Sequence, residues 1–265
     1  MVFDIFFYVC ASLCGLIAGS FLNVCIYRIP RGLSVASPRS ACPECGAKLR
    51  PADLIPLLSF IILRGKCASC HKRIPARYPA VEAVCGALWA AMYWRFAVSF
   101  QFICYALLGT ILIAVFFIDL EWMRIPNRLV LCAIVPSAAA ALRYAFILAP
   151  PERFRSLYNG VHAAEPLLGL IPCAFFLLIY IITSAAGGGK SAVGMGDVKL
   201  LLPAGLALGL RLCAFAVFIA VILGGVTGAA LILTKRKTKK DPIPFGPFLV
   251  FGVLAAVIFP YQFLF

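Results

Sequence analysis

The sequence predicts an all-α polytopic membrane protein in which several transmembrane helices carry a small cytoplasmic loop domain. Of the 265 residues, 63% are hydrophobic and only 13% are charged, whereas charged residues make up about 25% of a typical soluble domain. The apolar residues form continuous runs of roughly 20 residues with almost no charge, which is the length that crosses a hydrocarbon core of about 30 Å. These two observations favour membrane spans over the periodic apolar pattern of a soluble core.

About eight spans are predicted, near residues 2–26, 80–98, 100–118, 128–148, 166–186, 198–210, 212–233 and 245–265. The sixth is shorter than the others, and its ends are the least defined. Nineteen of the 24 lysines and arginines fall in the four loops on one side of this arrangement. Because basic loop residues concentrate in the cytoplasm, this side is predicted to be cytoplasmic and both termini are predicted outside. The same rule accounts for the net charge of +14, so we expect no nucleic-acid partner.

The first cytoplasmic loop, residues 27–79, contains two CxxC pairs separated by 21 residues. Each pair can hold one face of a tetrahedral ion, and four thiolates complete a structural zinc site. Disulfides are disfavoured in the reducing cytoplasm, which leaves unrelated free cysteines as the alternative to a metal. His71 directly follows the last cysteine and is expected to be a surface residue. The predicted zinc ligands are Cys42, Cys45, Cys67 and Cys70.

Between the two CxxC pairs lies the apolar stretch IPLLSFIIL (Ile55–Leu63). It is too short to span a bilayer and too apolar for an exposed loop. We therefore predict an interfacial or re-entrant segment that ties the zinc-binding loop domain to the bilayer.

Two aspartates lie at the ends of predicted spans on the cytoplasmic side. Asp119 closes the third span, and Asp197 precedes the sixth. A carboxylate at a span end is costly and usually functional, although a single one is more often a solvated flank or a helix cap. Two carboxyl groups that share a water hold one proton between them and can hydrolyse an amide by acid–base catalysis. The glycines Gly194 and Gly196 let a substrate strand approach Asp197 closely.

Six ordered motifs cover nearly the whole chain. They are GSFLNVCIYRIPRG (Gly19–Gly32), the paired CxxC motifs, RYPAVEAVCG (Arg77–Gly86), DLEWMRIPN (Asp119–Asn127), GMGDVKL (Gly194–Leu200) and PFGPFL (Pro244–Leu249). In these motifs the chain resembles the type IV prepilin peptidases, a GxGD group of membrane aspartyl peptidases. Asn127 stands where many of these relatives have Asp, and we expect no effect of this difference on catalysis.

The resemblance implies cleavage of the short basic leader of prepilins and pseudopilins, after a glycine, at the cytoplasmic face of the bacterial cytoplasmic (inner) membrane. By this analogy Asp119 and Asp197 are the catalytic pair, supported by a loop that includes Gly194, Gly196 and Lys199. Members with the cysteine loop often also methylate the new N-terminal residue with S-adenosylmethionine.

The resemblance also divides the chain into two predicted domains. Residues 1–98 hold the first two transmembrane helices, the four-cysteine loop (27–79) and a candidate methyltransferase part. Residues 99–265 form the transmembrane aspartyl peptidase domain.

No glycine-rich nucleotide loop is visible for a methyl donor. Four polar residues instead flank or enter the first two spans, where unpaired polar groups are costly: Asn23, Arg28, Arg77 and Glu82. These residues either bind the methyl donor or the substrate carboxylate, or an arginine pairs with Glu82 to hold the metal loop against the membrane.

Two other functions compete with the peptidase. In a membrane transporter, intramembrane carboxylates mark an ion path, and in a non-catalytic pilus or secretion assembly scaffold the metal loop is a docking module. A transporter predicts carboxylates near the midplane and related halves, neither of which is apparent in this sequence.

Overall fold

The computed structural model describes residues 2–146, 165–186, 193–238 and 241–259. The regular secondary structure of these residues is helical. Two isolated antiparallel β-bridges, Ala41–Lys48 and Lys66–Arg73, lie in the cysteine loop. Two compact units make up the chain, Met1–Phe102 and Ile103–Phe265. Some predicted features lie outside the described residues, namely the basic residues Arg153, Arg155, Lys190, Lys239 and Lys240 and the end of the last predicted span.

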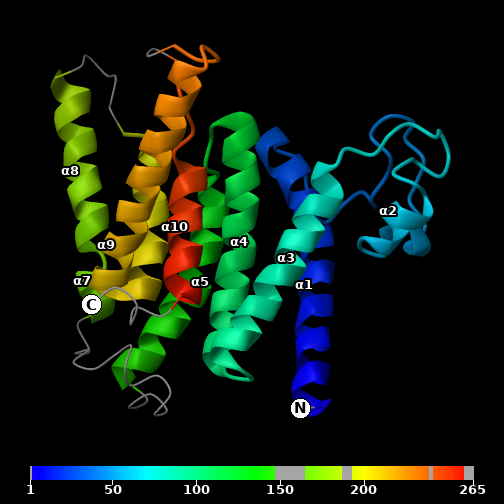
Figure 1. The fold of residues 1–265 in the computed structure, drawn as a ribbon, viewed down its shortest axis with the longest axis horizontal. Helices are drawn as coiled ribbons and strands as arrows, with labels where there is room; N and C mark the ends of the chain where they lie inside the picture. Colours follow the sequence, from blue (N-terminus) through cyan, green and yellow to red (C-terminus); the bar gives the residue numbers. More distant parts are fainter. Residues whose placement is uncertain (1, 147–164, 187–192, 239–240, 260–265) are drawn as a thin grey trace. The chain divides into compact units, whose positions relative to one another are not determined.

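The first unit pairs two long helices, α1 (Val2–Arg28) and α3 (Arg77–Phe96), which contact each other along their length (Figure 1). They approach closely because Gly15 and Gly19 of α1 face α3. A Cβ added at Gly15 would lie 2.6 Å from the carbonyl oxygen of Cys85. This small-xxx-small spacing lets membrane helices pack without a hydrophobic driving force between them.

The cysteine loop connects α1 to α3 and holds three short helices. The helix η1 (Ile29–Arg31) directly follows α1, and η2 (Pro51–Leu54) and α2 (Leu58–Ile62) lie between the two CxxC pairs. The predicted interfacial stretch therefore includes a short helix. Within the loop, this stretch is the main apolar element.

The second unit is built around α9 (Met195–Leu233), coloured yellow to orange in Figure 1. Helix α4 (Phe100–Trp122), most of which belongs to this unit, is joined to α9 by a buried hydrogen bond of 2.8 Å from the Tyr105 hydroxyl to the Ala207 carbonyl. The helices that pack against α9 are α5 (Asn127–Phe146), α7 (Glu165–Leu168), α8 (Ile171–Ala186) and α10 (Gly246–Ile258).

Helix α9 is broken near its middle. Gly209 has φ 70° and ψ −178°, a conformation that glycine adopts readily and that other residues avoid. A continuous helix of 39 residues would be about 58 Å long, roughly twice the thickness of a hydrocarbon core. The break divides α9 into two segments on either side of Gly209, and these overlap the predicted spans near 198–210 and 212–233.

Four helical stretches of the described chain are long and apolar enough to cross a membrane: Phe3–Arg31, Phe100–Trp122, Glu165–Ala186 and Met195–Leu233. The chain is therefore a multi-pass membrane protein. The number of about eight spans stays a prediction, because α3 and α5 have 20 residues each but contain charged residues and many alanines. Helix α10 is shorter, with 13 residues.

Candidate active site and metal centre

Asp119 lies in the last turn of α4, and its side chain is buried, with only 5% of the residue exposed. Its apolar neighbours on the helix, Val115 and Ile118, are fully buried as well. After α4 the chain reverses through Met123, whose φ is 50°, and α5 begins at Asn127. A buried carboxyl group is costly unless other groups compensate for the lost water, so Asp119 is a candidate functional residue.

Asp197 lies in the first turn of α9, three residues after the N-cap residue Gly194. Its carboxyl group folds back over the start of the helix, because a Cβ added at Gly194 would lie 2.8 Å from Oδ2. The backbone N–H of Gly194 donates a hydrogen bond to this carboxyl group. Helix N-termini stabilise negative charge, and glycine at position 194 leaves the space that this placement requires.

The structure brings the two aspartates together, although they lie on different helices and 78 residues apart in the sequence. Their carboxyl groups are within electrostatic range of each other. Two neighbouring carboxyl groups share a proton more readily than they both ionise. One can then activate water while the other donates a proton to the leaving group, which is the chemistry of an aspartic peptidase.

The start of α10 supplies a third segment beside the aspartates. The backbone N–H of Gly246 donates to the Asp119 carboxyl group, and a Cβ added at Gly246 would lie 2.6 Å from Asp119 Oδ2. Ile125 packs between the two glycines that flank the pair. Its side chain lies 3.2 Å from the Cβ position of Gly246 and 3.1 Å from that of Gly196. Ile125 therefore lies between the starts of α9 and α10, the two segments that contact the carboxyl groups.

Lys199, the other residue of the predicted supporting loop, contacts the start of α5. Its Nζ donates to Asn127 Oδ1 at 3.0 Å. This hydrogen bond joins the segment that follows Asp119 to the segment that contains Asp197. Lys199 thus links the two chain segments of the site through Asn127.

In the first unit, the four loop cysteines form one cluster. The Sγ atoms of Cys42, Cys45, Cys67 and Cys70 all lie within 4.8 Å of one another, and those of Cys42 and Cys70 are 4.0 Å apart. A disulfide holds its sulfurs about 2.05 Å apart, whereas a tetrahedral shell with Zn–S bonds of about 2.3 Å separates them by about 3.8 Å. The donor set therefore fits a tetrahedral metal ion.

The two CxxC pairs are shaped by the same backbone turn. The N–H of Gly46 donates to the Cys42 carbonyl at 2.9 Å, and the N–H of His71 donates to the Cys67 carbonyl at 3.0 Å. Gly46 and His71 both adopt left-handed φ values, 71° and 57°, so His71 takes the turn position that glycine takes in the other pair. Backbone N–H groups, that of Cys70 before that of Ser69, lower the pKa of the Cys67 thiol to about 7, whereas burial and the neighbouring thiols raise the pKa of the Cys70 thiol to about 11. Cys67 is therefore the thiol of this pair that more readily takes the thiolate form, which binds metals.

Comparisons with known proteins show the family of the chain. Residues 13–96 match the model of the Bacterial Peptidase A24 N-terminal domain, and residues 106–229 match that of the Type IV leader peptidase family. A prepilin leader peptidase/N-methyltransferase from Bacillus subtilis (strain 168) is 40% identical over 245 residues, which cover 92% of this chain and 91% of the relative. The chain belongs to the type IV leader peptidase family.

Relatives with the same name extend across bacteria. The protein of Stutzerimonas stutzeri is 30% identical over 276 residues, covering 95% of this chain and 90% of the relative. The protein of Neisseria gonorrhoeae is 30% identical over 263 residues, which cover 90% of this chain and 86% of the relative. No solved structure matches the chain.

In this leader peptidase family member, two of the four predicted polar residues tie the start of α3 to its surroundings. Asn23, which is 3% exposed, donates through Nδ2 to the Tyr78 carbonyl at 3.0 Å. The Glu82 carboxylate accepts a hydrogen bond of 2.9 Å from the backbone N–H of Leu57. Asn23 therefore joins α1 to α3, and Glu82 joins α3 to the cysteine loop.

The two arginines of this set make other contacts. Arg28 donates to the carbonyl oxygens of Ser34 and Pro38, at 2.9 and 2.8 Å, and so folds the chain just after α1. Arg77 lies over the ring of its neighbour Tyr78, with its Cζ 5.0 Å from the centroid. Glu82 is thus held to the cysteine loop by the backbone N–H of Leu57, and the pairing of an arginine with Glu82 stays a prediction.

Sequence reasoning did not single out Ile125 and Gly246 as residues beside the aspartate-bearing segments. The motif PFGPFL was noted, and its Gly-Pro step at a helix start is the one local signal that a specific backbone position is needed there. Nothing in the sequence connects that glycine to Asp119, because the two residues are more than a hundred positions apart.

Proposed function

We propose that the chain cleaves the basic leader peptide of type IV prepilins and pseudopilins with Asp119 and Asp197 as the catalytic pair, and that it methylates the new N-terminal residue. The observation that carries the peptidase proposal is the juxtaposition of the two carboxyl groups, each with a backbone N–H donor. The ionised member activates a water molecule for attack on the scissile carbonyl. The protonated member donates to the carbonyl oxygen or to the leaving amine.

The glycines at the site explain how a peptide reaches the buried Asp119 and the half-buried Asp197. Gly194 and Gly246 lie directly against Asp197 and Asp119, so no side chain at these positions blocks the approach of an extended backbone. The Lys199–Asn127 hydrogen bond supports the two chain segments that carry the carboxyl groups.

The four-cysteine cluster is proposed to bind zinc, which stabilises the loop domain and takes no part in peptide hydrolysis. Its sulfur positions support this assignment. The loop, the site and both activities are proposed to face the cytoplasm of a bacterial inner membrane, with about eight spans and both termini outside, because this orientation follows from the distribution of basic residues.

For methylation, S-adenosylmethionine supplies the methyl group, and the polar set Asn23, Arg28, Arg77 and Glu82 is the candidate binding region. Asn23 supports this choice best. Its Oδ1 is buried and has no hydrogen-bond partner in the described part of the chain, so this acceptor is available to an amino or hydroxyl group of the methyl donor.

The deciding experiment is leader cleavage by the full-length protein in proteoliposomes, with Asp119→Asn and Asp197→Asn compared with wild type. Loss of a catalytic acid or base is expected to lower the rate by at least about a hundredfold. Asp4→Asn is the matched control, because Asp4 is an exposed carboxylate at the start of α1. Mass spectrometry with S-adenosylmethionine present detects an added methyl group on the mature product. Full cleavage by either variant, with its fold and metal content unchanged, would remove the aspartate pair as the catalyst.

A further inference from the structure

The segment between the two CxxC pairs exposes several large apolar side chains. Ile55, Leu58, Ile61 and Ile62 are 47%, 50%, 68% and 69% exposed. A soluble loop does not normally leave several large apolar side chains together in water. The surface formed by these four residues of the α2 region is called the apolar ridge below.

The apolar ridge lies beside the membrane helices of its unit. The backbone N–H of Leu57 donates to Glu82 at 2.9 Å, and Glu82 is five residues into α3, which starts at Arg77. At the rise of an α-helix this places the contact about 7.5 Å along α3 from its first residue. Figure 1 shows α2 alongside the α1–α3 pair and not beyond its end. Amphipathic segments beside membrane helices lie in the headgroup region of a bilayer.

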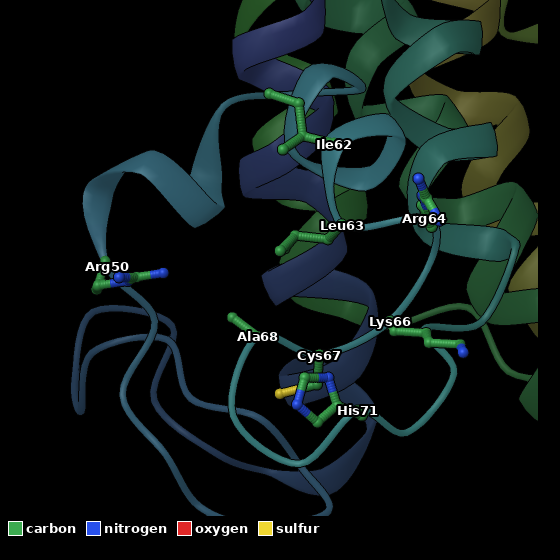
Figure 2. A pocket seen from close by; sticks show the side chains of 8 residues that line it. All are labelled: Arg50, Ile62, Leu63, Arg64, Lys66, Cys67, Ala68 and His71. Atoms are coloured by element: carbon green, nitrogen blue, oxygen red, sulfur yellow. The ribbon is translucent and has the colours of Figure 1, made fainter.

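A basic pocket adjoins the apolar ridge. Its volume is about 400 Å³, and its lining residues are Arg50, Ile62, Leu63, Arg64, Lys66, Cys67, Ala68 and His71 (Figure 2). Arg50 is paired with Asp53, at 3.2 Å. Arg64 and Lys66 are exposed and lie on the opposite side of the pocket from Arg50 in Figure 2. Ile62 belongs to both surfaces, so the cationic and apolar surfaces are continuous.

The net positive charge of the loop indicates what kind of molecule binds to this surface. Residues 27–79 contain ten basic residues and only two acidic ones, Glu44 and Asp53. Both acidic residues are engaged, Glu44 with Lys72 at 2.6 Å and Asp53 with Arg50. A basic prepilin leader is repelled by such a surface, whereas the phosphates of anionic lipids are attracted to it.

We propose that the apolar ridge and the basic pocket together dock the cysteine loop onto the surface of an anionic phospholipid bilayer. The side chains of the ridge enter the boundary between headgroups and acyl chains. Arg64 and Lys66 bind a lipid phosphate at the mouth of the pocket. The docked segment fixes the height of the metal centre through the Leu57–Glu82 hydrogen bond. This proposal does not depend on the identity of the catalytic residues.

The test is hydrogen–deuterium exchange of the full-length protein in nanodiscs, read on peptides that cover residues 51–66. Amide exchange in this segment is expected to be several-fold slower in phosphatidylglycerol nanodiscs than in phosphatidylcholine nanodiscs. Because basic residues near an anionic surface are attracted to its phosphates, the double variant Arg64→Ala/Lys66→Ala is expected to remove this difference. Ile61→Asn/Ile62→Asn is expected to raise exchange in both lipids, because the ridge no longer inserts.

The matched control is Lys48→Ala/Arg73→Ala, which removes the same charge from exposed positions of the loop outside the pocket. It is expected to keep the lipid dependence. Equal exchange of the wild-type segment in both lipids would overturn the proposal, and so would a lipid dependence that survives in Arg64→Ala/Lys66→Ala. Protection of the segment by inorganic phosphate in phosphatidylcholine nanodiscs would make the pocket a site for free anions. Protection of the segment by a prepilin peptide in phosphatidylcholine nanodiscs would make the pocket a substrate site. Either result would exclude lipid docking as the role of the pocket.

Discussion

The backbone of Gly246 lies against the carboxyl group of Asp119, so closely that a Cβ at position 246 would stand 2.6 Å from Oδ2. Real Cβ atoms do not approach an oxygen at this distance, so any other residue at position 246 must displace the carboxyl group or the start of α10. Asp119 itself is buried, and the N–H of Gly246 donates to it. The start of α10 therefore sets the position of one of the two proposed catalytic groups.

Gly246→Ala is expected to lower leader cleavage by about a hundredfold, because displacement of a catalytic group by about 1 Å has an effect of this size. Cleavage rates in proteoliposomes measure it. Gly225→Ala is the control, since a Cβ at Gly225 meets nothing within 4 Å, and its rate is expected to match wild type. A positioning role for Gly246 also predicts a changed pH profile of kcat. An unchanged profile and rate in Gly246→Ala would show that the Asp119 carboxyl group tolerates the added methyl group.

The hydrogen bond from Lys199 to Asn127 is expected to support the site without taking part in the chemistry. Lys199→Met removes the donor and is expected to lower stability by about 1 kcal/mol, with a modest fall in kcat and little change in KM. Asn127→Asp keeps an acceptor for Lys199 and is expected to cleave at the wild-type rate. Thermal unfolding measures the stability of the two variants, and steady-state cleavage measures their kcat and KM. Complete loss of cleavage in a stable Lys199→Met protein would instead assign Lys199 to the reacting groups.

Replacing one cysteine of each pair is expected to remove the metal. Cys42→Ser/Cys67→Ser should lose bound zinc, measured by elemental mass spectrometry, because two thiolates do not complete a tetrahedral shell. Stability and methylation are expected to fall more than cleavage. Cys132→Ser, which changes an exposed cysteine outside the loop, should retain zinc and both activities. Lost cleavage with retained methylation would reverse the roles proposed for the two units.

The close contact of α1 and α3 is expected to depend on glycine. Gly15→Leu places a large side chain where a Cβ alone would lie 2.6 Å from the Cys85 carbonyl oxygen, and overpacking of this kind costs about 1–3 kcal/mol. Ile17→Leu is the control, since Ile17 is 64% exposed. Thermal unfolding in detergent should show a lower midpoint for Gly15→Leu only. Equal midpoints would mean that the helices separate at little cost.

The cysteine cluster and the helical class were predictable because both depend on short-range patterns. The CxxC spacing places two thiols on one turn, and the structure confirms that the two pairs converge. The number of spans was less accessible to sequence reasoning. One apolar run can form two helices where a glycine breaks it, as Gly209 does in α9. Helices α3 and α5 contain charged residues and many alanines, so their hydropathy does not mark them as spans in the way that it marks the four strongly apolar stretches.

The polar residues near the first two helices show where sequence reasoning reaches its limit. Asn23, Arg28 and Glu82 were grouped because each is a costly polar residue near a span. In the structure they make separate contacts, to Tyr78, to the Ser34 and Pro38 carbonyls and to Leu57. A backbone partner carries no signature in the sequence, because every residue offers the same N–H and C=O groups.

By itself, the sequence determined that this protein enters the membrane, that its loop carries four metal-type ligands, and that two aspartates stand at the ends of apolar helices. Composition, spacing and hydropathy are local properties, and they are sufficient for these conclusions. Only the tertiary structure decided that Gly246 lies against Asp119 and that Ile125 packs against Gly196 and Gly246. It also decided that Lys199 reaches Asn127 and that α2 is held beside α3. These contacts join residues far apart in the chain, and their positions follow from how the helices pack, which no local pattern specifies.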